Sequence, residues 1–310
     1  MKPSPKRTAL LPPRLGSGDR IGVVAPAGPV REEALERGLA TLRGRGYEVV
    51  EGAHLRQRAG YLAGSDRDRL ADFNKMIRDP RVRAVWYARG GYGSARIVEG
   101  LDFAALRRRP KALIGYSDAT VLHAALWRRE RLASYYAPNI SEVGDPARYD
   151  ARSLWGFLEG GEDAEIDLPF GKATVLRGGR AEGVLLGGCL SLLVSLVGTP
   201  WALPDAGAIF FWEEVGEEPY RIDRMLGHLR QSGCLAGIAA MIVGQTVGCE
   251  AKDPANAVPL REIVRRHLEA ARIPVLVGVP AGHGPGKLTL PLGRRVRLDA
   301  NRGVLALSGR

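Results

Sequence analysis

Short apolar runs alternate with amphipathic stretches along roughly the first 130 residues, and this alternation predicts strands and helices in turn. Residues 20–26 (RIGVVAP) form an apolar run that ends at a proline, which is typical of a buried strand followed by a loop. Over residues 31–43, apolar side chains recur at the spacing of one helix face. The same criteria predict strands over 47–50, 82–87 and 111–114 and helices over 66–77, 93–99 and 117–129. Strands that alternate with helices favour parallel βαβ units, in which ligands bind at the C-terminal ends of the strands.

The pattern changes after residue 155. The stretch 156–182 is rich in glycine and acidic residues and lacks a sustained helical period, so it predicts a linker or a hairpin. Later strands are expected over 208–212, 239–243, 275–279 and 296–298, and helices near 220–230 and 259–271. We therefore expect an α/β protein with an N-terminal doubly wound, mostly parallel sheet domain over 1–155. A smaller, β-rich α/β domain over 183–310 is expected to follow the linker.

An uncharged stretch over residues 183–204 reaches the ~20 residues that a membrane span needs. Glycines and a Thr-Pro step interrupt it, so we expect a buried strand and a short helix instead. The apolar run at 9–11 is too short for the core of a signal peptide. These features predict a cytoplasmic protein without a membrane partner.

Composition narrows the class of protein further. The chain has 310 residues, 45% apolar and 25% charged, which excludes a wholly disordered or coiled-coil chain. Its net charge of +11 is spread along the sequence, and the basic runs at 107–109 and 128–131 are short, so no nucleic-acid partner is expected. Cys189, Cys234 and Cys249 form no C-x-x-C pair and cannot all pair in disulfides, which favours a reducing compartment.

A serine follows the apolar strand in residues 112–120 (ALIGYSDAT). The chain turns through Gly115 into a predicted helix at Ser117, and such an elbow exposes the hydroxyl beside backbone N–H groups that can stabilise an oxyanion. The alternative interpretation is that Ser117 only caps the helix. The motif by itself does not decide between them, because Ala119 stands where the full G-x-S-x-G pattern has glycine.

Adjacent glycines follow the preceding strand in residues 88–94 (ARGGYGS). Gly90 and Gly91 let the backbone approach a ligand closely, so either could supply an oxyanion-hole N–H. A phosphate loop is disfavoured because neither G-x-G-x-x-G nor G-K-[ST] is present. An ordinary tight turn remains the other interpretation.

Two later strands end in groups that can carry or orient a proton. Residues 210–221 (FFWEEVGEEPYR) place Glu213 and Glu214 at the end of one apolar run, and residues 280–284 (PAGHG) place His283 between glycines after another. A histidine in a glycine loop favours a general base. The acidic cluster could equally be a solvated turn before a helix. A serine nucleophile needs a base and an acid that orients the base, so Ser117, a glutamate and His283 together predict a serine hydrolase.

Several motifs, in order, resemble the LD-carboxypeptidase (muramoyltetrapeptide carboxypeptidase) family of serine peptidases. The resemblance covers about residues 18–298, nearly the whole chain. The motifs that carry it are YLAGSDRDRLADFNKMIRDP from residue 61, RGGYGSAR from 89, GYSDATVLHAAL from 115, GTP from 198, WEEVGEEPYRIDRMLGHL from 212 and PAGHGPGKLTLPLG from 280.

The resemblance implies a role for each residue that its motifs match. Ser117 would be the nucleophile, His283 the general base and Glu213 the acid that orients the base. The N–H groups of Gly91 and Asp118 would form the oxyanion hole. No metal or other cofactor is implied, and a homodimer is.

Two further assignments are open. We prefer Glu213 to Glu214 as the orienting acid because alternation along the strand sends their side chains to opposite faces. A substrate with a free terminal carboxylate calls for a cation, and Arg89, Arg221 and Arg224 are candidates. Glu217 is a further substrate-facing residue.

The resemblance also implies a reaction. Members of the family remove the terminal D-alanine from murein tetrapeptides during cell-wall recycling, so the expected partner is a small peptide substrate. A sister branch, the microcin C immunity peptidases, cleaves aminoacyl-nucleotide conjugates and is the alternative enzyme. A catalytically silent murein-fragment binding protein is the alternative of another class.

This chain has Tyr136-Ala137-Pro138 where the family often has His-Gly-Pro, and Cys189 where it often has Asn. These departures put the substrate in question more than the hydrolysis.

Overall fold

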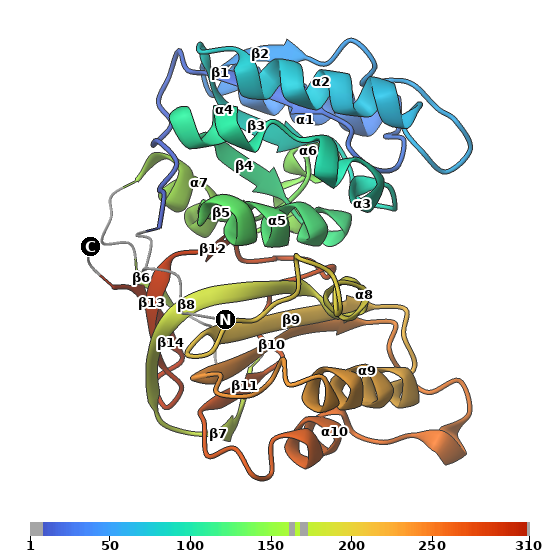
Figure 1. Cartoon of the computed structure of the whole chain (residues 1–310), viewed down its shortest axis with the longest axis vertical. Helices are drawn as coiled ribbons and strands as arrows, with labels where there is room; N and C mark the ends of the chain where they lie inside the picture. The colour runs from blue at the N-terminus through green and yellow to red at the C-terminus, as the bar shows by residue number, and fades with distance from the viewer. Residues whose placement is uncertain (1–8, 161–164, 168–172, 309–310) are drawn as a thin grey trace. The chain divides into compact units, whose positions relative to one another are not determined.

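In the computed structural model, which describes residues 9–160, 165–167 and 173–308, the apolar runs of the first half form one parallel sheet. The chain divides into two units, one of residues 1–146 with 291–294 and one of residues 147–290 with 295–310. The strand order in the first unit is β12-β5-β4-β3-β1-β2, and β1 to β5 pair in parallel (Figure 1). The strands of this sheet are β1 (Arg20–Val24), β2 (Glu48–Glu51), β3 (Val82–Tyr87), β4 (Ala112–Gly115), β5 (Ser134–Tyr136) and β12 (Leu290–Leu292).

Helices connect these strands and cover both faces of the sheet. The chain runs from β1 outward to β2 and then back past β1 to β3, and right-handed crossovers in opposite directions place α1 and α2 on opposite faces. Accordingly α1 packs with α6, whereas α2, α3, α4 and α5 pack with one another (Figure 1). The helices are α1 (Glu32–Gly44), α2 (Asp66–Arg78), α3 (Ser94–Ile97), α4 (Phe103–Arg108), α5 (Thr120–Glu130) and α6 (Ile140–Val143), with 3-10 turns η1 (Val98–Gly100), η2 (Ser117–Ala119) and η3 (Pro146–Arg148).

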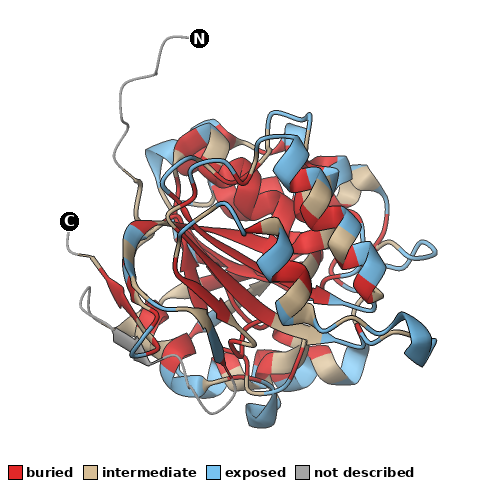
Figure 2. Cartoon of the chain, turned by 90° about the horizontal axis from the view of Figure 1, so that it is seen from below, coloured by how far each residue is buried: buried red, intermediate tan, exposed pale blue. Residues whose placement is uncertain are grey.

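Local sequence explains the helices that flank this sheet. In α1, Leu35, Leu39 and Leu42 recur on one face and are buried. Helix α2 begins after Ser65, whose side chain accepts a hydrogen bond from the backbone N–H of Asp68 at 3.1 Å. Figure 2 shows the same distribution of burial, because most central strands are buried and the outer faces of the helices are exposed.

The second unit is built on an eight-stranded mixed sheet with the order β6-β14-β13-β8-β9-β10-β11-β7. Its centre, β8 to β11, is parallel, and β7, β13, β14 and β6 extend it as antiparallel pairs. The strands are β6 (Glu165–Asp167), β7 (Thr174–Arg177), β8 (Arg180–Cys189), β9 (Ile209–Val215), β10 (Ala240–Val247), β11 (Val275–Val277), β13 (Arg295–Asp299) and β14 (Val304–Leu307). The helices are α7 (Ala151–Glu159), α8 (Leu190–Ser195), α9 (Pro219–Gln231) and α10 (Leu260–His267), with the 3-10 turn η4 (Pro254–Asn256).

The expected fold class is confirmed, since a parallel-rich α/β unit precedes a β-rich α/β unit. The second unit is comparable in length to the first rather than smaller. The uncharged stretch 183–204 forms most of β8, then α8, as expected. In the described parts of the chain, no helix is both long enough and apolar enough to cross a membrane.

The boundaries of the units differ from the predicted limits at 155 and 183. The first unit ends at Pro146, because the segment after it is bonded to the second unit's own loop. Asp150 donates its N–H to the carbonyl of Lys287 at 2.9 Å, and the Ser153 hydroxyl accepts the N–H of Thr289 at 3.1 Å. Where the predicted linker 156–182 is described, it contains the end of α7, β6, β7 and the start of β8, so it belongs to the second unit. Residues 161–164 and 168–172 of that linker lie outside the described residues.

Candidate functional site

Ser117 lies at a strained elbow between β4 and α5. Its φ of +66° is in the left-handed region, which non-glycine residues rarely adopt. The capping position of the turn η2 is Tyr116, and no side chain caps η2 or α5, so the interpretation of Ser117 as a helix cap is wrong. The structure therefore shows the strand, the sharp turn and the helix that a nucleophile elbow requires.

Side chains from neighbouring elements hold this elbow at consecutive residues. The carbonyl of Gly115 lies 2.8 Å from Nε2 of His123, and the N–H of Tyr116 donates to Oδ1 of Asn139 at 3.3 Å. The N–H of Ser117 donates to the hydroxyl of Tyr136 at 3.3 Å. These bonds compensate for the strained backbone, because the surroundings determine the turn on both sides of Ser117.

The glycine loop after β3 lies directly against Ser117. A Cβ added at Gly90 would fall 2.8 Å from Cβ and 2.9 Å from Oγ of Ser117, so only glycine fits there. The carbonyl of Gly90 accepts the N–H of Gly28 at 3.1 Å, which joins this loop to the loop after β1. Strand order reverses between β1 and β3, and open α/β sheets bind ligands at such a switch point. Gly91, with φ of +111°, is the next residue in this loop.

Asp118 braces the elbow against the same loop. Its side chain is buried, and Oδ2 accepts the backbone N–H of Ser94 at 2.7 Å. Burial raises the pKa of this carboxyl, and its hydrogen bonds with Ser94 oppose that shift. Asp118 therefore connects the turn that carries Ser117 to the chain just after Gly91.

Tyr136, one of the departures from the family pattern, belongs to this elbow. Its side chain is buried, and its ring meets the ring of Tyr116 edge-on with centroids 5.9 Å apart. Its hydroxyl accepts the N–H of Ser117. This departure, which we expect to concern the substrate more than the catalytic residues, therefore also contacts the backbone of the predicted nucleophile.

In the second unit, buried Glu213 pairs with half-buried His283. Oε2 of Glu213 lies 2.7 Å from Nδ1 of His283, and the glutamate is wholly buried at the end of β9. Only glycine fits at two positions beside it, since an added Cβ would fall 2.5 Å from Oε2 at Gly282 and 2.9 Å from Cβ of Glu213 at Gly244. With Nδ1 bound to the carboxylate, Nε2 is the ring nitrogen that can accept a proton.

Glu214 points to the opposite face of β9, as alternation along the strand predicts. Its carboxylate accepts the N–H of Ser191 at 2.6 Å and that of Val215 at 2.8 Å, and it lies 3.4 Å from Sγ of Cys189. Burial raises the pKa of Glu214, and burial together with the charges of both glutamates raises the pKa of the Cys189 thiol. Cys189 is thus a protonated, weakly nucleophilic thiol in a turn that Glu214 stabilises.

The predicted substrate-binding residues lie in loops of the two units. The Arg89 guanidinium donates to the carbonyl of Pro29 at 2.8 Å. Glu217 and Arg221 form an ion pair of 3.4 Å at the start of α9, and Arg221 also donates to the hydroxyl of Tyr220 at 3.0 Å. Arg221 is thus partly engaged by neighbours within its own turn.

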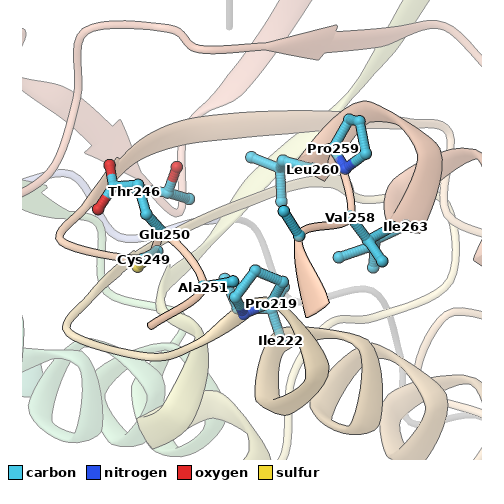
Figure 3. Close-up of a pocket in the computed structure, with 11 residues that line it drawn as sticks. Pro219, Ile222, Thr246, Cys249, Glu250, Ala251, Val258, Pro259, Leu260 and Ile263 are labelled. Atoms are coloured by element: carbon cyan, nitrogen blue, oxygen red, sulfur yellow. The ribbon is translucent and has the colours of Figure 1, made fainter. Parts of the chain in front are cut away.

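A pocket of about 360 Å³ opens elsewhere in the second unit. Figure 3 shows side chains of the turn after β10 on one side of it, those of the α10 start on the other, and those of the α9 start below. Neither Glu213 nor His283 lines it. The lining is mostly apolar and consists of Pro219, Ile222, Thr246, Cys249, Glu250, Ala251, Ala257, Val258, Pro259, Leu260 and Ile263.

Sequence reasoning missed Gln245, which directly follows Gly244 on β10. Its side chain bonds both Gly284 and Pro285, the residues after His283. A polar residue beside a glycine at the end of an apolar strand was the available signal. In the described part of the chain, no group of three or more His, Cys, Asp or Glu side chains is arranged to hold a metal ion.

Comparison with known proteins finds two family models. The LD-carboxypeptidase N-terminal domain matches residues 21–137, and the LD-carboxypeptidase C-terminal domain matches residues 182–298. Ser117 falls in the first match, and Glu213 and His283 fall in the second.

Named relatives align over nearly the whole chain. A probable murein peptide carboxypeptidase of Bacillus subtilis is 36% identical over 93% of this chain and 91% of its own length. The murein tetrapeptide carboxypeptidase of Pseudomonas aeruginosa is 33% identical over 91% of this chain and 94% of its own.

Solved structures show the same fold. The muramoyltetrapeptide carboxypeptidase of Oxalobacter formigenes is similar with a TM-score of 0.82 and 30% identity, covering 94% of this chain and 99% of that one. MccF in complex with glutamyl sulfamoyl guanosine is similar with a TM-score of 0.89 and 23% identity, covering 97% and 99%.

Proposed function

Because the chain belongs to the LD-carboxypeptidase family of serine peptidases, we propose that it removes the terminal D-alanine from murein tetrapeptides in cell-wall recycling. The observation that carries the proposal is the Ser117 elbow, strained at φ of +66° and packed against Gly90. The Glu213–His283 pair in the second unit supplies the base and its orienting acid.

In the proposed first step, His283 removes the proton from the hydroxyl of Ser117. Oγ then attacks the carbonyl carbon of the residue before D-alanine, and the carbonyl oxygen becomes an oxyanion. The N–H groups of Gly91 and Asp118 are proposed to bind that oxyanion, a type of contact worth about 10²–10³ in rate per donor. His283 returns its proton to the leaving amine, D-alanine departs, and the peptide stays bound to Ser117 as an ester.

In the second step, water hydrolyses this ester. His283 takes a proton from the water as its oxygen adds to the ester carbonyl. The bond between the acyl carbon and Oγ of Ser117 then breaks, His283 returns the proton to Oγ, and the shortened peptide leaves as a carboxylic acid. The carboxylate of Glu213 stabilises the imidazolium that forms in each step. The close 2.7 Å contact between Oε2 and Nδ1 is what this role requires.

Recognition of the terminal carboxylate of the substrate is assigned to Arg89. It directly precedes the glycine loop that contacts Ser117, and its exposed guanidinium has further donors beyond the one that holds Pro29. Arg221 and Glu217 are retained as weaker substrate-side candidates, since they bond to each other.

The proposal places the enzyme in the cytoplasm as a homodimer that acts on a small peptide. In the described part of the chain, Cys189, Cys234 and Cys249 form no disulfide, which fits a reducing compartment. Sedimentation at micromolar concentration tests the dimer, which requires twice the chain mass of 33.5 kDa. Fractionation of cells tests the location.

The substrate class is tested by mass spectrometry after incubation with L-Ala-γ-D-Glu-meso-diaminopimelate-D-Ala and, separately, with glutamyl sulfamoyl guanosine. Loss of one D-alanine from the peptide, with the conjugate intact, is the expected result. Cleavage of the conjugate alone would replace the proposal by the immunity-type activity, for which the likeness to MccF at 23% identity supports the fold alone. Binding of the peptide without cleavage of either compound would identify a silent binding protein.

A further inference from the structure

The loop that carries His283 is held by a neighbouring strand on both sides of the histidine. The backbone N–H of Gln245 donates to the carbonyl of Ala281 at 2.9 Å, which fixes the chain before His283. After it, the N–H of Gly284 donates to Oε1 of Gln245 at 2.8 Å, and Nε2 of Gln245 donates to the carbonyl of Pro285 at 3.1 Å. One residue therefore bonds the loop at three points that bracket the imidazole.

An irregularity in β10 makes these bonds available. The pairing of β10 with β9 shifts register between Val243 and Thr246, so Gly244 and Gln245 leave the regular ladder. A bulge of this kind turns a strand and re-aims its side chains. Only glycine fits at position 244, where β10 approaches the histidine loop, since an added Cβ would fall 2.3 Å from the carbonyl oxygen of Ala281.

The chemistry of the loop selects a side-chain amide at position 245. The loop presents one N–H and one C=O to this side chain, and an amide has both an acceptor oxygen and donor hydrogens. A carboxylate would only accept, and an ammonium or guanidinium would only donate. Gly284 completes the fit, since a Cβ there would fall 2.6 Å from Nε2 and 2.7 Å from Cδ of Gln245.

We propose that Gln245 is a positioning residue, which holds the 281–285 loop so that the His283 imidazole stays aligned with Glu213. It acts on the reaction only through His283, so this inference rests on the proposed role of His283 as the base. A displacement of a catalytic group by about 1 Å can cost about 10²-fold in rate. Loss of the amide should therefore lower kcat and leave KM nearly unchanged.

The test uses Gln245→Met, which keeps the length of the side chain and removes both hydrogen bonds. We expect kcat for D-alanine release to fall about 10- to 100-fold with KM within about twofold. Gln231→Met is the matched control, because Gln231 is an exposed residue at the end of α9. It should change neither constant.

A second readout needs no substrate. The His283 N–H that is bonded to Glu213 should give a downfield proton resonance, assigned by its absence in His283→Gln. In Gln245→Met this resonance should shift or broaden. If the enzyme cleaves neither test compound but the resonance responds in this way, the positioning role stands and the proposed function falls.

A double-mutant cycle separates positioning from general destabilisation. Gly284→Ala should displace the amide of Gln245, so the double variant Gln245→Met/Gly284→Ala should lose little more than either single variant. An unchanged kcat and an unchanged resonance in Gln245→Met would overturn the proposal. So would losses that simply add in the double variant.

Discussion

The close approach of the glycine loop to the predicted nucleophile makes Gly90→Ala the most informative single substitution. The added Cβ would fall 2.8 Å from Cβ and 2.9 Å from Oγ of Ser117, whereas carbon atoms pack best at about 3.5–4.0 Å. Either the loop or the serine must therefore move by about 0.7–1 Å. A shift of this size in a reacting group costs about 10²-fold in rate, or about 2.7 kcal/mol of transition-state stabilisation.

Steady-state release of D-alanine from the tetrapeptide measures this effect, and a thermal melt shows whether the variant stays folded. Overpacking of this kind costs about 1–3 kcal/mol of stability, so kcat is compared at a temperature where both proteins are folded. Gly44→Ala is the control, because Gly44 is the exposed last residue of α1 and an added Cβ meets nothing within 4 Å. It should leave kcat unchanged and the stability equal or slightly higher. A folded Gly90→Ala enzyme with kcat within about threefold of the parent would refute the inferred packing of the loop on Ser117.

Three further predictions concern side chains around the Ser117 elbow and around the Glu213–His283 pair. Burial lowers the pKa of His123 to about 4, against about 6.5 in the unfolded chain. Between pH 4 and pH 6.5, the His123 imidazole is therefore protonated in the unfolded chain and neutral in the folded one. The free energy of unfolding should therefore fall by up to about 3 kcal/mol as the pH drops from 6.5 to 4, and His123→Gln should flatten that part of the profile in urea titrations. Tyr136→Phe removes the acceptor for the Ser117 N–H and should lower kcat about two- to tenfold without changing KM. An unchanged kcat would show that this bond does not position the serine. Glu213→Gln should lower kcat about 10³-fold or more. Glu214→Gln should instead cost about 1–3 kcal/mol of stability and leave kcat within a few-fold of the parent. A larger loss of kcat in Glu214→Gln than in Glu213→Gln would exchange the roles of the two glutamates.

The sequence predicted the parts of the fold that depend on local pattern. Strand β4 is a continuous apolar run, β3 is one that only the exposed Arg83 interrupts, and α1 shows a regular apolar face, so their positions follow from the sequence pattern. The region 156–182 was harder, because β6 and β7 are short strands that pair at the two edges of the second sheet with β14 and β11. The partner strand lies about 140 residues away in the sequence for β6 and about 100 for β7, and no local pattern encodes such pairing.

The site shows the same division between local and distant information. Ser117 and His283 were identifiable because each is a polar residue in a turn after an apolar strand, and Glu213 was preferred to Glu214 by strand alternation. The contacts of Tyr136 and Gln245 were not identifiable. They arise where another strand reaches the elbow and where a bulge in β10 meets the histidine loop, and both are tertiary events.

The measurement that tests the central claim most directly is quantitative release of D-alanine from the murein tetrapeptide by the parent enzyme and by Ser117→Ala, both shown to be folded by circular dichroism. The account predicts that the parent releases one D-alanine per peptide and that Ser117→Ala is slower by at least about 10³-fold in kcat. Equal release by the two proteins would contradict the assignment of Ser117 as the nucleophile.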